Sequence, residues 1–311
     1  MNNKRSIICI GLGTYKRPNM LQRALESIAD LTLPKDADVV FLLCDNEPQP
    51  ASEELFLSLQ GSLNMASHYL HEPRKGLVYM RNKILDEANK LAADYLAYFD
   101  DDEVVHQDWI VSLYDGIKKF DSAAIGGPVI MKWPQGTHVD SHVKAFIDNN
   151  PVSGESGDVR ERLATNNVLI DLNFVRKHEL RFNMRFNLLG GEDSFFFEQI
   201  RQNNGKLVWC NEALVFAEVI PDRNSEEFIW KRIFRIGQTL YLKEELLNGK
   251  KGTIEKIGLI FRGFKLWRKY FFYRGDHERK IELKKRWVKA KGMIQVIIGK
   301  DFKEYESGDG Y

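Results

Sequence analysis

The sequence of 311 residues contains only three cysteines, and they form no recognisable motif. Cys9, Cys44 and Cys210 lie far apart in apolar stretches, without a CxxC pair or a Cys/His spacing. This excludes a small disulfide-framed domain and a structural zinc site, because both need closely spaced or paired ligands. We expect buried free thiols in a reducing compartment.

A long hydrophobic run is also missing. No window of about 18 uncharged apolar residues occurs, so no transmembrane helix is expected. The start, MNNKRSIICIGLGTY, passes from a short basic stretch into a strand-like run without a cleavage site, and no signal peptide is expected. With 43% hydrophobic and 29% charged residues, the chain can form one large domain, or one domain with an appendage.

The net charge of +1 hides an uneven distribution. Residues 231–303 contain 21 Lys and Arg against 7 Asp and Glu, a net charge of +14, whereas the rest contains 24 against 37, a net charge of −13. We therefore expect an acidic domain over residues 1–225 and a basic, aromatic helical region over residues 226–311, which face different partners.

Apolar periodicity predicts an α/β fold. SIICIGLGTY, ADVVFLLCDN and DYLAYFDDD are typical of buried strands, and NMLQRALESIADL and RKGLVYMRNKILDEANKLA have helical spacing. The first hundred residues therefore predict the order β-α-β-α-β in a parallel sheet. Further strands are expected in AAIGGPVIMKW and KLVWCNEALVFAEV, and long helices from Ser225 onward.

Four acidic residues directly follow the third predicted strand: Asp100, Asp101, Asp102 and Glu103. Adjacent like charges repel each other, so we expect a positive group nearby. Two carboxylates in such a DXD-type cluster can bind Mg²⁺ or Mn²⁺, with substrate phosphates completing the coordination. The alternative is a solvated acidic loop that caps the next helix.

The turn after the first strand, GLGTYKRP, has the start of a dinucleotide-binding glycine pattern, but Lys16 stands where the third glycine should fall. Thr14, Tyr15 and Arg17 suit a loop that contacts a nucleotide. The alternative is an ordinary strand-to-helix turn with Pro18 at the first helical position.

Together these segments resemble family 2 glycosyltransferases with the GT-A fold. The resemblance covers about residues 5–240 and is carried, in family order, by GTYKRPNMLQRALESI, LLCDNEP, KGLVYMRNKIL, YFDDDEVVHQDWI and LLGGEDSFFFEQIRQNNGKLVW. EVIPDRNSEEFIWKRIFRIGQT is similar to a bacterial polysaccharide branch of the family. The resemblance implies a mostly parallel central sheet flanked by helices. It also implies inverting transfer of a hexose from a nucleotide-diphosphate sugar, most simply UDP-linked, to a glycan or lipid-linked glycan in surface polysaccharide or lipopolysaccharide synthesis.

The resemblance also assigns roles to residues. The implied donor-binding residues are Thr14, Tyr15, Arg17, Asp45, Arg81, Asp100 and Asp101. The QxxRW motif of processive relatives is absent; WKRIFRIG supplies Arg232 and Arg235 instead, which either contact the diphosphate of the donor or coat a surface helix. The implied ligands of Mg²⁺ or Mn²⁺ are Asp102, Asp100 and Glu218, where Glu218 replaces a histidine of many relatives. Asp193 is the implied general base and Glu192 the residue that positions the acceptor, although acids at that position also suit a helix N-terminus.

Several alternatives remain open. Asn166 and Asn167 either bind sugar hydroxyls or cap a turn. The basic aromatic region either binds an anionic membrane surface, as we expect for a peripheral protein on the cytoplasmic side of a bacterial membrane, or packs on the acidic domain. A nucleic-acid partner is not expected, because no other feature resembles a nucleic-acid-binding module. Rival functions are a catalytically inactive nucleotide-sugar or glycan-binding protein and a metal-dependent phosphoryl-transfer enzyme.

Overall fold

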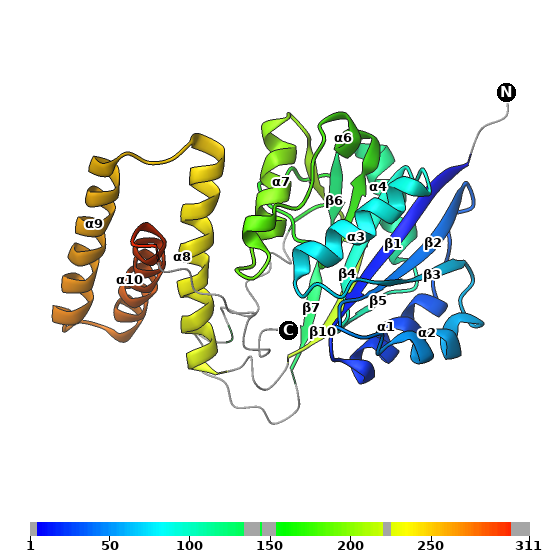
Figure 1. Cartoon of the computed structure of the whole chain (residues 1–311), viewed down its shortest axis with the longest axis horizontal. Helices are drawn as coiled ribbons and strands as arrows, with labels where there is room; N and C mark the ends of the chain where they lie inside the picture. Colours follow the sequence, from blue (N-terminus) through cyan, green and yellow to red (C-terminus); the bar gives the residue numbers. More distant parts are fainter. Residues whose placement is uncertain (1–4, 134–143, 145–153, 220–224, 300–311) are drawn as a thin grey trace. The chain divides into compact units, whose positions relative to one another are not determined.

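The computed structural model describes residues 5–133, 144, 154–219 and 225–299, and the chain divides into two compact units (Figure 1). The first unit holds the elements from β1 to β10, and the second holds Leu188–Gly191 and helices α8, α9 and α10. The domain boundary predicted between residues 225 and 226 adjoins residues 220–224, which lie outside the described residues, and it stays a prediction. Among the described helices, none is long and apolar enough to cross a lipid bilayer.

The first unit is built around a seven-stranded sheet with the strand order β3-β2-β1-β4-β8-β6-β9. Its strands are β1 (Ser6–Thr14), β2 (Ala37–Asp45), β3 (Ala66–His71), β4 (Tyr95–Asp100), β6 (Ala124–Gly126), β8 (Asn167–Asp171) and β9 (Leu207–Trp209). Strand β8 runs antiparallel to β4 and β6, and the other neighbouring pairs are parallel. A second sheet has the order β5-β10-β7 and consists of β5 (Glu103–Val105), β10 (Val215–Glu218) and β7 (Val129–Lys132).

Helices cover both faces of the large sheet, as expected for strands that are apolar on both sides. These helices are α1 (Pro18–Ala29), α2 (Glu53–Gln60), α3 (Leu77–Lys90), α4 (Trp109–Phe120), α6 (Leu172–Lys177) and α7 (Glu192–Gln202), with the short 3-10 helix η1 (Met184–Phe186). Ile8 and Ile10 of β1 belong to the core that the sheet shares with α1, α2 and α4. Gly11, which points to the opposite face, lies against Ile84 of α3.

The structure adds elements to the strand order that the sequence predicts. Helix α2 and strand β3 lie between the second and third predicted strands, so the first hundred residues fold as β-α-β-α-β-α-β. Strand β3 is an edge strand with alternating exposure, and its polar sequence ASHYLH contains no apolar run that would predict a strand. The apolar stretches AAIGGPVIMKW and KLVWCNEALVFAEV each divide into two strands that belong to different sheets.

The second unit contains the long helices that the sequence predicts after Ser225. These are α8 (Glu226–Asn248), α9 (Thr253–Phe272) and α10 (His277–Ile297), and the Ser225 hydroxyl caps α8 by accepting a hydrogen bond from the Phe228 amide at 3.1 Å. Helices α8 and α10 cross closely, because a side chain at Gly237 or Gly292 would collide with a backbone carbonyl of the other helix. The three cysteines, all in the first unit, are free and buried as predicted.

Candidate active site

The strand register brings several of the predicted residues to one edge of the large sheet. Thr14 at the end of β1 pairs with Asp45 at the end of β2, and Gly13 pairs with Asp100 at the end of β4. Because these strands are parallel, the loops that follow them leave the sheet on the same side. The turn after β1, which is predicted to contact a nucleotide, and the acidic cluster after β4 therefore lie next to each other.

Two arginines supply the positive charge that the acidic cluster requires. Arg17 Nη1 donates a hydrogen bond to Asp101 at 2.8 Å and lies 3.3 Å from an Asp102 carboxylate oxygen. The Thr14 hydroxyl also donates to Asp101, at 2.9 Å. On the other side, Arg81 Nη2 lies 3.8 Å from Asp100. The predicted donor-binding residues of β1, α3 and β4 are thus in contact with one another.

The cluster still carries more negative charge than these two arginines neutralise. The partly buried position of Asp100 raises its pKa to about 6, and Asp102 and Asp101 add to this increase, although Arg81 opposes it. Burial also raises the pKa of Glu103 well above its usual value, with further contributions from Asp100 and Asp102. Glu103 accepts hydrogen bonds from the Asp100 amide at 2.8 Å and from Asn166 at 3.1 Å. A cation at this site would relieve the repulsion between the carboxylates.

The residues present fit a divalent cation that shares its coordination with a substrate. Within the described ranges, no three His, Cys, Asp or Glu side chains converge into a complete metal site. The Asp100 side chain is 45% exposed, and Asp102 lines an open pocket together with Glu103 and Glu218. Mg²⁺ is commonly held by one or two carboxylates and substrate phosphates, which matches this arrangement. Glu218 is 60% exposed and forms a 2.8 Å ion pair with Arg23, so its role as a ligand stays a prediction.

The predicted catalytic acids begin helix α7, and their surroundings differ. Glu192 is buried and forms an ion pair with Arg81, which links α7 to the helix that also faces Asp100. Asp193 is less buried and receives a 2.6 Å hydrogen bond from the Ser194 amide. Glu192 holds the Arg81 guanidinium in place, and its predicted contact with an acceptor stays a prediction.

Asp45 is held by the protein itself. Its buried carboxylate accepts hydrogen bonds from the amides of Glu47, Ala51 and Ser52 at 2.8–2.9 Å and from the Tyr69 hydroxyl at 2.7 Å. Although burial raises the pKa of Asp45, these hydrogen bonds outweigh it and hold the pKa below its usual value. The carboxylate closes the loop after β2, and its predicted contact with a donor stays a prediction.

This environment predicts a pH-dependent loss of stability in an Asp45→Asn variant. Because the folded-state pKa is lower than the unfolded-state pKa, the carboxylate stabilises the fold above its usual pKa, and this contribution disappears as the pH falls through the folded-state value. At pH 7 we expect a loss of about 2–3 kcal/mol, since hydrogen bonds to a charged acceptor are lost. Urea unfolding at pH 7 and pH 3 should show the difference from wild type shrinking at the lower pH; an equal difference at both would contradict this account.

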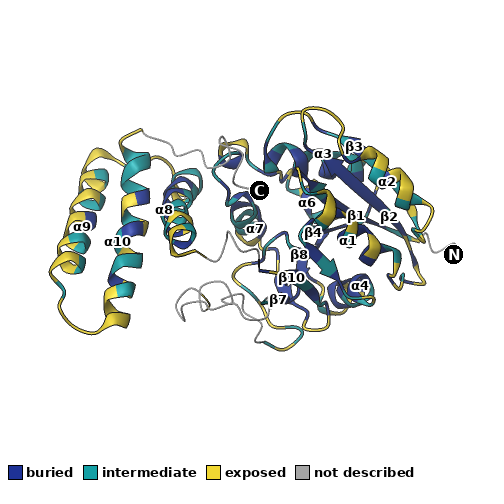
Figure 2. Ribbon diagram, turned by 90° about the horizontal axis from the view of Figure 1, so that it is seen from below, coloured by how far each residue is buried: buried dark blue, intermediate teal, exposed yellow. Residues whose placement is uncertain are grey.

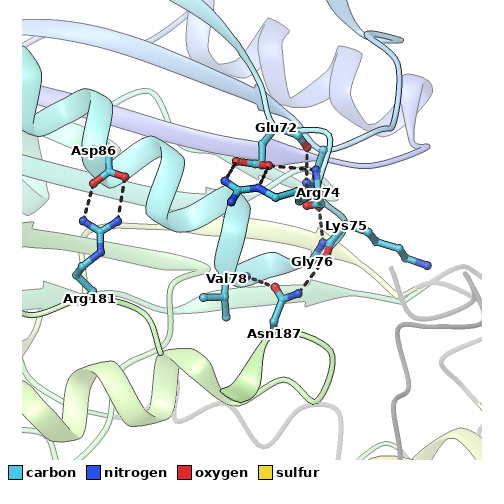
Figure 3. Close-up of polar contacts among 9 residues, drawn as sticks. Glu72, Arg74, Lys75, Gly76, Val78, Asp86, Arg181 and Asn187 are labelled. Atoms are coloured by element: carbon cyan, nitrogen blue, oxygen red, sulfur yellow. Dashed lines mark hydrogen bonds and ion pairs between the residues drawn. The ribbon is translucent and has the colours of Figure 1, made fainter. Parts of the chain in front are cut away.

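Two asparagines that sequence reasoning missed hold the loop between β3 and α3. Asn46 donates hydrogen bonds to the carbonyls of Glu72 and Arg74 at 2.7 and 2.8 Å and accepts one from the Gly76 amide at 2.9 Å. Figure 3 shows Asn187 against the next part of this loop, where it donates to the Lys75 carbonyl at 3.0 Å and accepts from an amide of α3 at 3.1 Å. The motif LLCDNEP contains Asn46, but no pattern in the sequence singles out Asn187.

The loop carries a cation toward the turn after β1. Lys75 Nζ lies 5.5 Å from the centre of the buried Tyr15 ring, and Lys16 Nζ lies 5.3 Å from it. Two ammonium groups therefore lie within cation–π range of the Tyr15 ring. Tyr15 directly follows Thr14, whose hydroxyl donates a hydrogen bond to Asp101. This arrangement places positive charge beside the turn that follows β1.

We expect Gly76→Ala to destabilise the first unit strongly. Gly76 has φ +134°, a conformation that is essentially restricted to glycine, and a Cβ there would collide with the Asn187 amide. The expected cost is about 1–3 kcal/mol for the backbone alone. Gly61→Ala is the matched control, because Gly61 has φ −67° and open space around it. Thermal unfolding should show a lower midpoint for Gly76→Ala only; equal midpoints would contradict the structural role of the loop.

The remaining predicted residues lie in other settings. Arg232 and Arg235 are on α8 in the second unit, and their contact with a donor stays a prediction. Asn166 contacts Glu103, so it remains beside the acidic cluster. The sequence allows Asn167 either to bind sugar hydroxyls or to cap a turn, but its side chain is buried and its hydrogen-bonding groups are used inside the protein, which contradicts a sugar-binding role. Its buried amide binds the Trp109 indole at 2.8 Å and the carbonyls of Pro128 and Ala213 at 2.9 and 2.7 Å.

Comparison with known proteins agrees with this geometry. The family model described as "Glycosyl transferase family 2" matches residues 9–184, which is more than half of the chain. The succinoglycan biosynthesis protein ExoM of Rhizobium meliloti (strain 1021) is 30% identical over 239 residues, covering 77% of this chain and 75% of ExoM.

Solved structures with a similar fold include two complexes with nucleotide sugars. S. aureus TarS 1-349 in complex with UDP-GlcNAc aligns with a TM-score of 0.54 and 14% identity, covering 97% of this chain and 95% of that one. The chain spans only 44% of a longer TarS structure. The mannosyltransferase PcManGT of Pyrobaculum calidifontis, in complex with GDP-Man and Mn²⁺, aligns with a TM-score of 0.62 and 10% identity, covering 96% of this chain and 89% of that one.

Proposed function

Because this chain belongs to glycosyl transferase family 2 and has the GT-A fold, we propose that it is an inverting transferase that uses a nucleotide-diphosphate sugar. The family and the fold were both predicted from the sequence and are confirmed. The proposal rests mainly on one observation: the turn after β1, the acidic cluster after β4 and the Arg81–Glu192 pair at the start of α7 meet in one network. This network joins a site suited to a diphosphate with the start of α7, where Asp193, next to Glu192, is suited to proton abstraction.

In the proposed reaction, an acceptor hydroxyl oxygen attacks the anomeric carbon of the donor from the side opposite the diphosphate. The new carbon–oxygen bond forms as the bond to the diphosphate oxygen breaks, and the nucleoside diphosphate leaves with the electron pair. Asp193 receives the hydroxyl proton as general base. A single displacement inverts the anomeric configuration, so an α-linked donor gives a β-glycoside.

The other residues of the network bind and orient the reactants. Asp100 and Asp102 would hold Mg²⁺ or Mn²⁺, which when bound neutralises charge on the diphosphate. Arg17 keeps Asp101 and Asp102 in place, and Arg81 keeps a fixed positive charge beside Asp100. Thr14, Tyr15 and Lys75 line the approach to the donor. The predicted Mn²⁺ and nucleotide sugar are supported by the PcManGT complex, which contains GDP-Man and Mn²⁺, and by the UDP-GlcNAc in TarS.

The proposed donor is a UDP-linked hexose, and the proposed acceptor is a glycan, most simply lipid-linked, in a bacterial surface polysaccharide or lipopolysaccharide. The likeness to ExoM, a succinoglycan biosynthesis protein, supports the polysaccharide context. A lipid-linked acceptor would place the enzyme at the cytoplasmic face of the membrane as a peripheral protein. The net charge of +14 over residues 231–303 supports contact with an anionic surface.

Release of nucleoside diphosphate from a panel of UDP and GDP sugars tests the proposed activity. We expect one donor to be cleaved slowly by water without acceptor, with loss of activity on adding a chelator and recovery with Mn²⁺. Binding of a donor without any release, even with bacterial lipid-linked glycans, would favour an inactive binding protein. Transfer of a phosphoryl group instead of a sugar would favour the rival enzyme class, which the lack of an aspartate after β1 already disfavours.

A further inference from the structure

Helix α9 presents a largely apolar stripe to solvent. We call this the α9 stripe; its residues are Ile254, Ile257, Phe261, Phe264, Phe271 and Phe272, and each is between 47% and 86% exposed. At 3.6 residues per turn, these six positions fall within an arc of about 100° on one face of the helix. Figure 2 shows much of α9 in the colour of exposed residues. Large apolar side chains gathered in this way mark a binding surface.

The opposite face of α9 is occupied by α10. Gly263 is buried against Ile294, and the Tyr270 ring stacks on Trp287 with the ring centres 5.4 Å apart. This packing does not use the α9 stripe, which therefore is not needed to form the core between the two helices. The aromatic residues of the stripe remain exposed after α9 packs on α10.

The charge around the stripe indicates what it contacts. Helix α9 contains five basic residues and one acidic residue, Glu255, and so carries a net charge of +4. Arg262, Lys265 and Lys269 are exposed and flank the stripe on one side, and Arg268 lies within its arc. Long basic side chains can extend to lipid phosphates while nearby aromatic rings enter the interface. An anionic lipid surface satisfies both the apolar and the basic side chains.

We propose that α9 lies flat on an anionic lipid bilayer, with the α9 stripe inserted at the boundary between headgroups and acyl chains. A second copy of this chain fits the surface less well, because pairing two α9 helices would bring two charges of +4 together and place Arg268 in an apolar seam. The proposal deepens the proposed function by assigning membrane contact to one face of one helix, and it rests on that function only for its biological purpose.

Vesicle flotation of the full-length protein tests this proposal. Vesicles of pure phosphatidylcholine are compared with vesicles containing phosphatidylglycerol, for wild type and for the triple variant Phe261→Ser/Phe264→Ser/Phe271→Ser. We expect wild type to float only with the anionic vesicles, and the triple variant to partition at least about 100-fold more weakly, since three large apolar groups are lost. Lys265→Ser/Lys269→Ser should weaken binding about fivefold for each charge removed, and added salt should weaken it further.

The matched control removes three exposed apolar side chains from the first unit, as Leu57→Ser/Val159→Ser/Met184→Ser. This control should float like wild type. Equal flotation of the stripe variant and the control would overturn the proposal, as would wild type that stays soluble with anionic vesicles. A wild-type dimer that the stripe variant converts to monomer, without vesicle binding, would assign the surface to a second copy instead.

Nucleotide binding provides a separate readout. Stabilisation by UDP and Mn²⁺, measured without vesicles, should be unchanged in the stripe variant, because no stripe residue belongs to the candidate active site. Flotation without nucleotide stabilisation would support the membrane surface but contradict the proposed donor. Nucleotide stabilisation without flotation would support the proposed donor but contradict the membrane surface. The two proposals can therefore fail independently.

Discussion

Replacing Asp193 with asparagine should lower kcat by about 10²- to 10⁴-fold, the usual contribution of a positioned general base. Asparagine preserves the size of the side chain and the hydrogen bond from the Ser194 amide, but it cannot accept the acceptor proton at neutral pH. Binding of the donor should be unchanged, because the donor-side contacts of Thr14 and Arg17 are not altered. Initial rates and the donor dissociation constant, measured on the same preparation, separate the two effects.

Glu198→Gln is the matched control for this substitution. Glu198 lies on the same helix and forms an ion pair with Arg201 at 3.2 Å, away from the Arg81–Glu192 pair. Its replacement should leave kcat within about twofold of wild type, because surface ion pairs contribute little. A similar kcat for Asp193→Asn and Glu198→Gln would show that Asp193 is not the base. A loss of donor binding in Asp193→Asn would assign the residue to the donor site.

The second large effect is expected for Arg81→Met, which should destabilise the first unit by about 3–5 kcal/mol. The side chains of Arg81 and Glu192 are only 9% and 3% exposed, so removal of the guanidinium leaves a carboxylate buried without its partner. The same substitution removes the positive charge near Asp100. Chemical unfolding of the purified variant measures the loss directly.

Arg181→Met provides a control, because Arg181 lies in the loop before η1 and pairs with the same helix, α3. Arg181 forms a bidentate ion pair with Asp86 of α3, with distances of 2.6 and 2.9 Å (Figure 3). Both side chains are about half exposed. Loss of this pair should cost at most about 1 kcal/mol. Equal costs for the two variants would contradict the structural role of the buried pair. The double variant Arg81→Met/Glu192→Leu should recover part of the lost stability, because no isolated charge then remains buried.

The features that the sequence predicted well are those set by local pattern. Continuous apolar runs marked β1, β2 and β4, and the acids that follow β4 indicated a cationic partner before the structure placed Arg17 and Arg81 there. The GGEDSFF segment predicted acids at a helix start, and α7 begins at Glu192. The motif order carried the assignment of the family, because several short motifs together are more specific than each one alone.

The features that the sequence did not predict depend on contacts between distant segments. Edge strand β3 is polar because the rest of the protein buries only part of it. Strand β8 is defined by its antiparallel pairing with β4 and β6, which are distant in sequence. Asn187 holds Lys75 across 112 positions of sequence, and Asn167 reaches Trp109 across 58. An asparagine gives no sign in sequence of whether its amide binds a backbone or a sugar. Only the three-dimensional contacts decide between these roles.

Calorimetric titration of UDP and GDP, with and without Mn²⁺, into wild type and Asp102→Ala tests the central claim most directly. The account predicts that one nucleotide binds wild type in the presence of Mn²⁺, and that removing either the metal or the Asp102 carboxylate weakens binding at least about tenfold, since the metal joins the acidic cluster to the diphosphate. Equal, metal-independent binding to both proteins, or no binding to folded wild type, would contradict a diphosphate site at the acidic cluster.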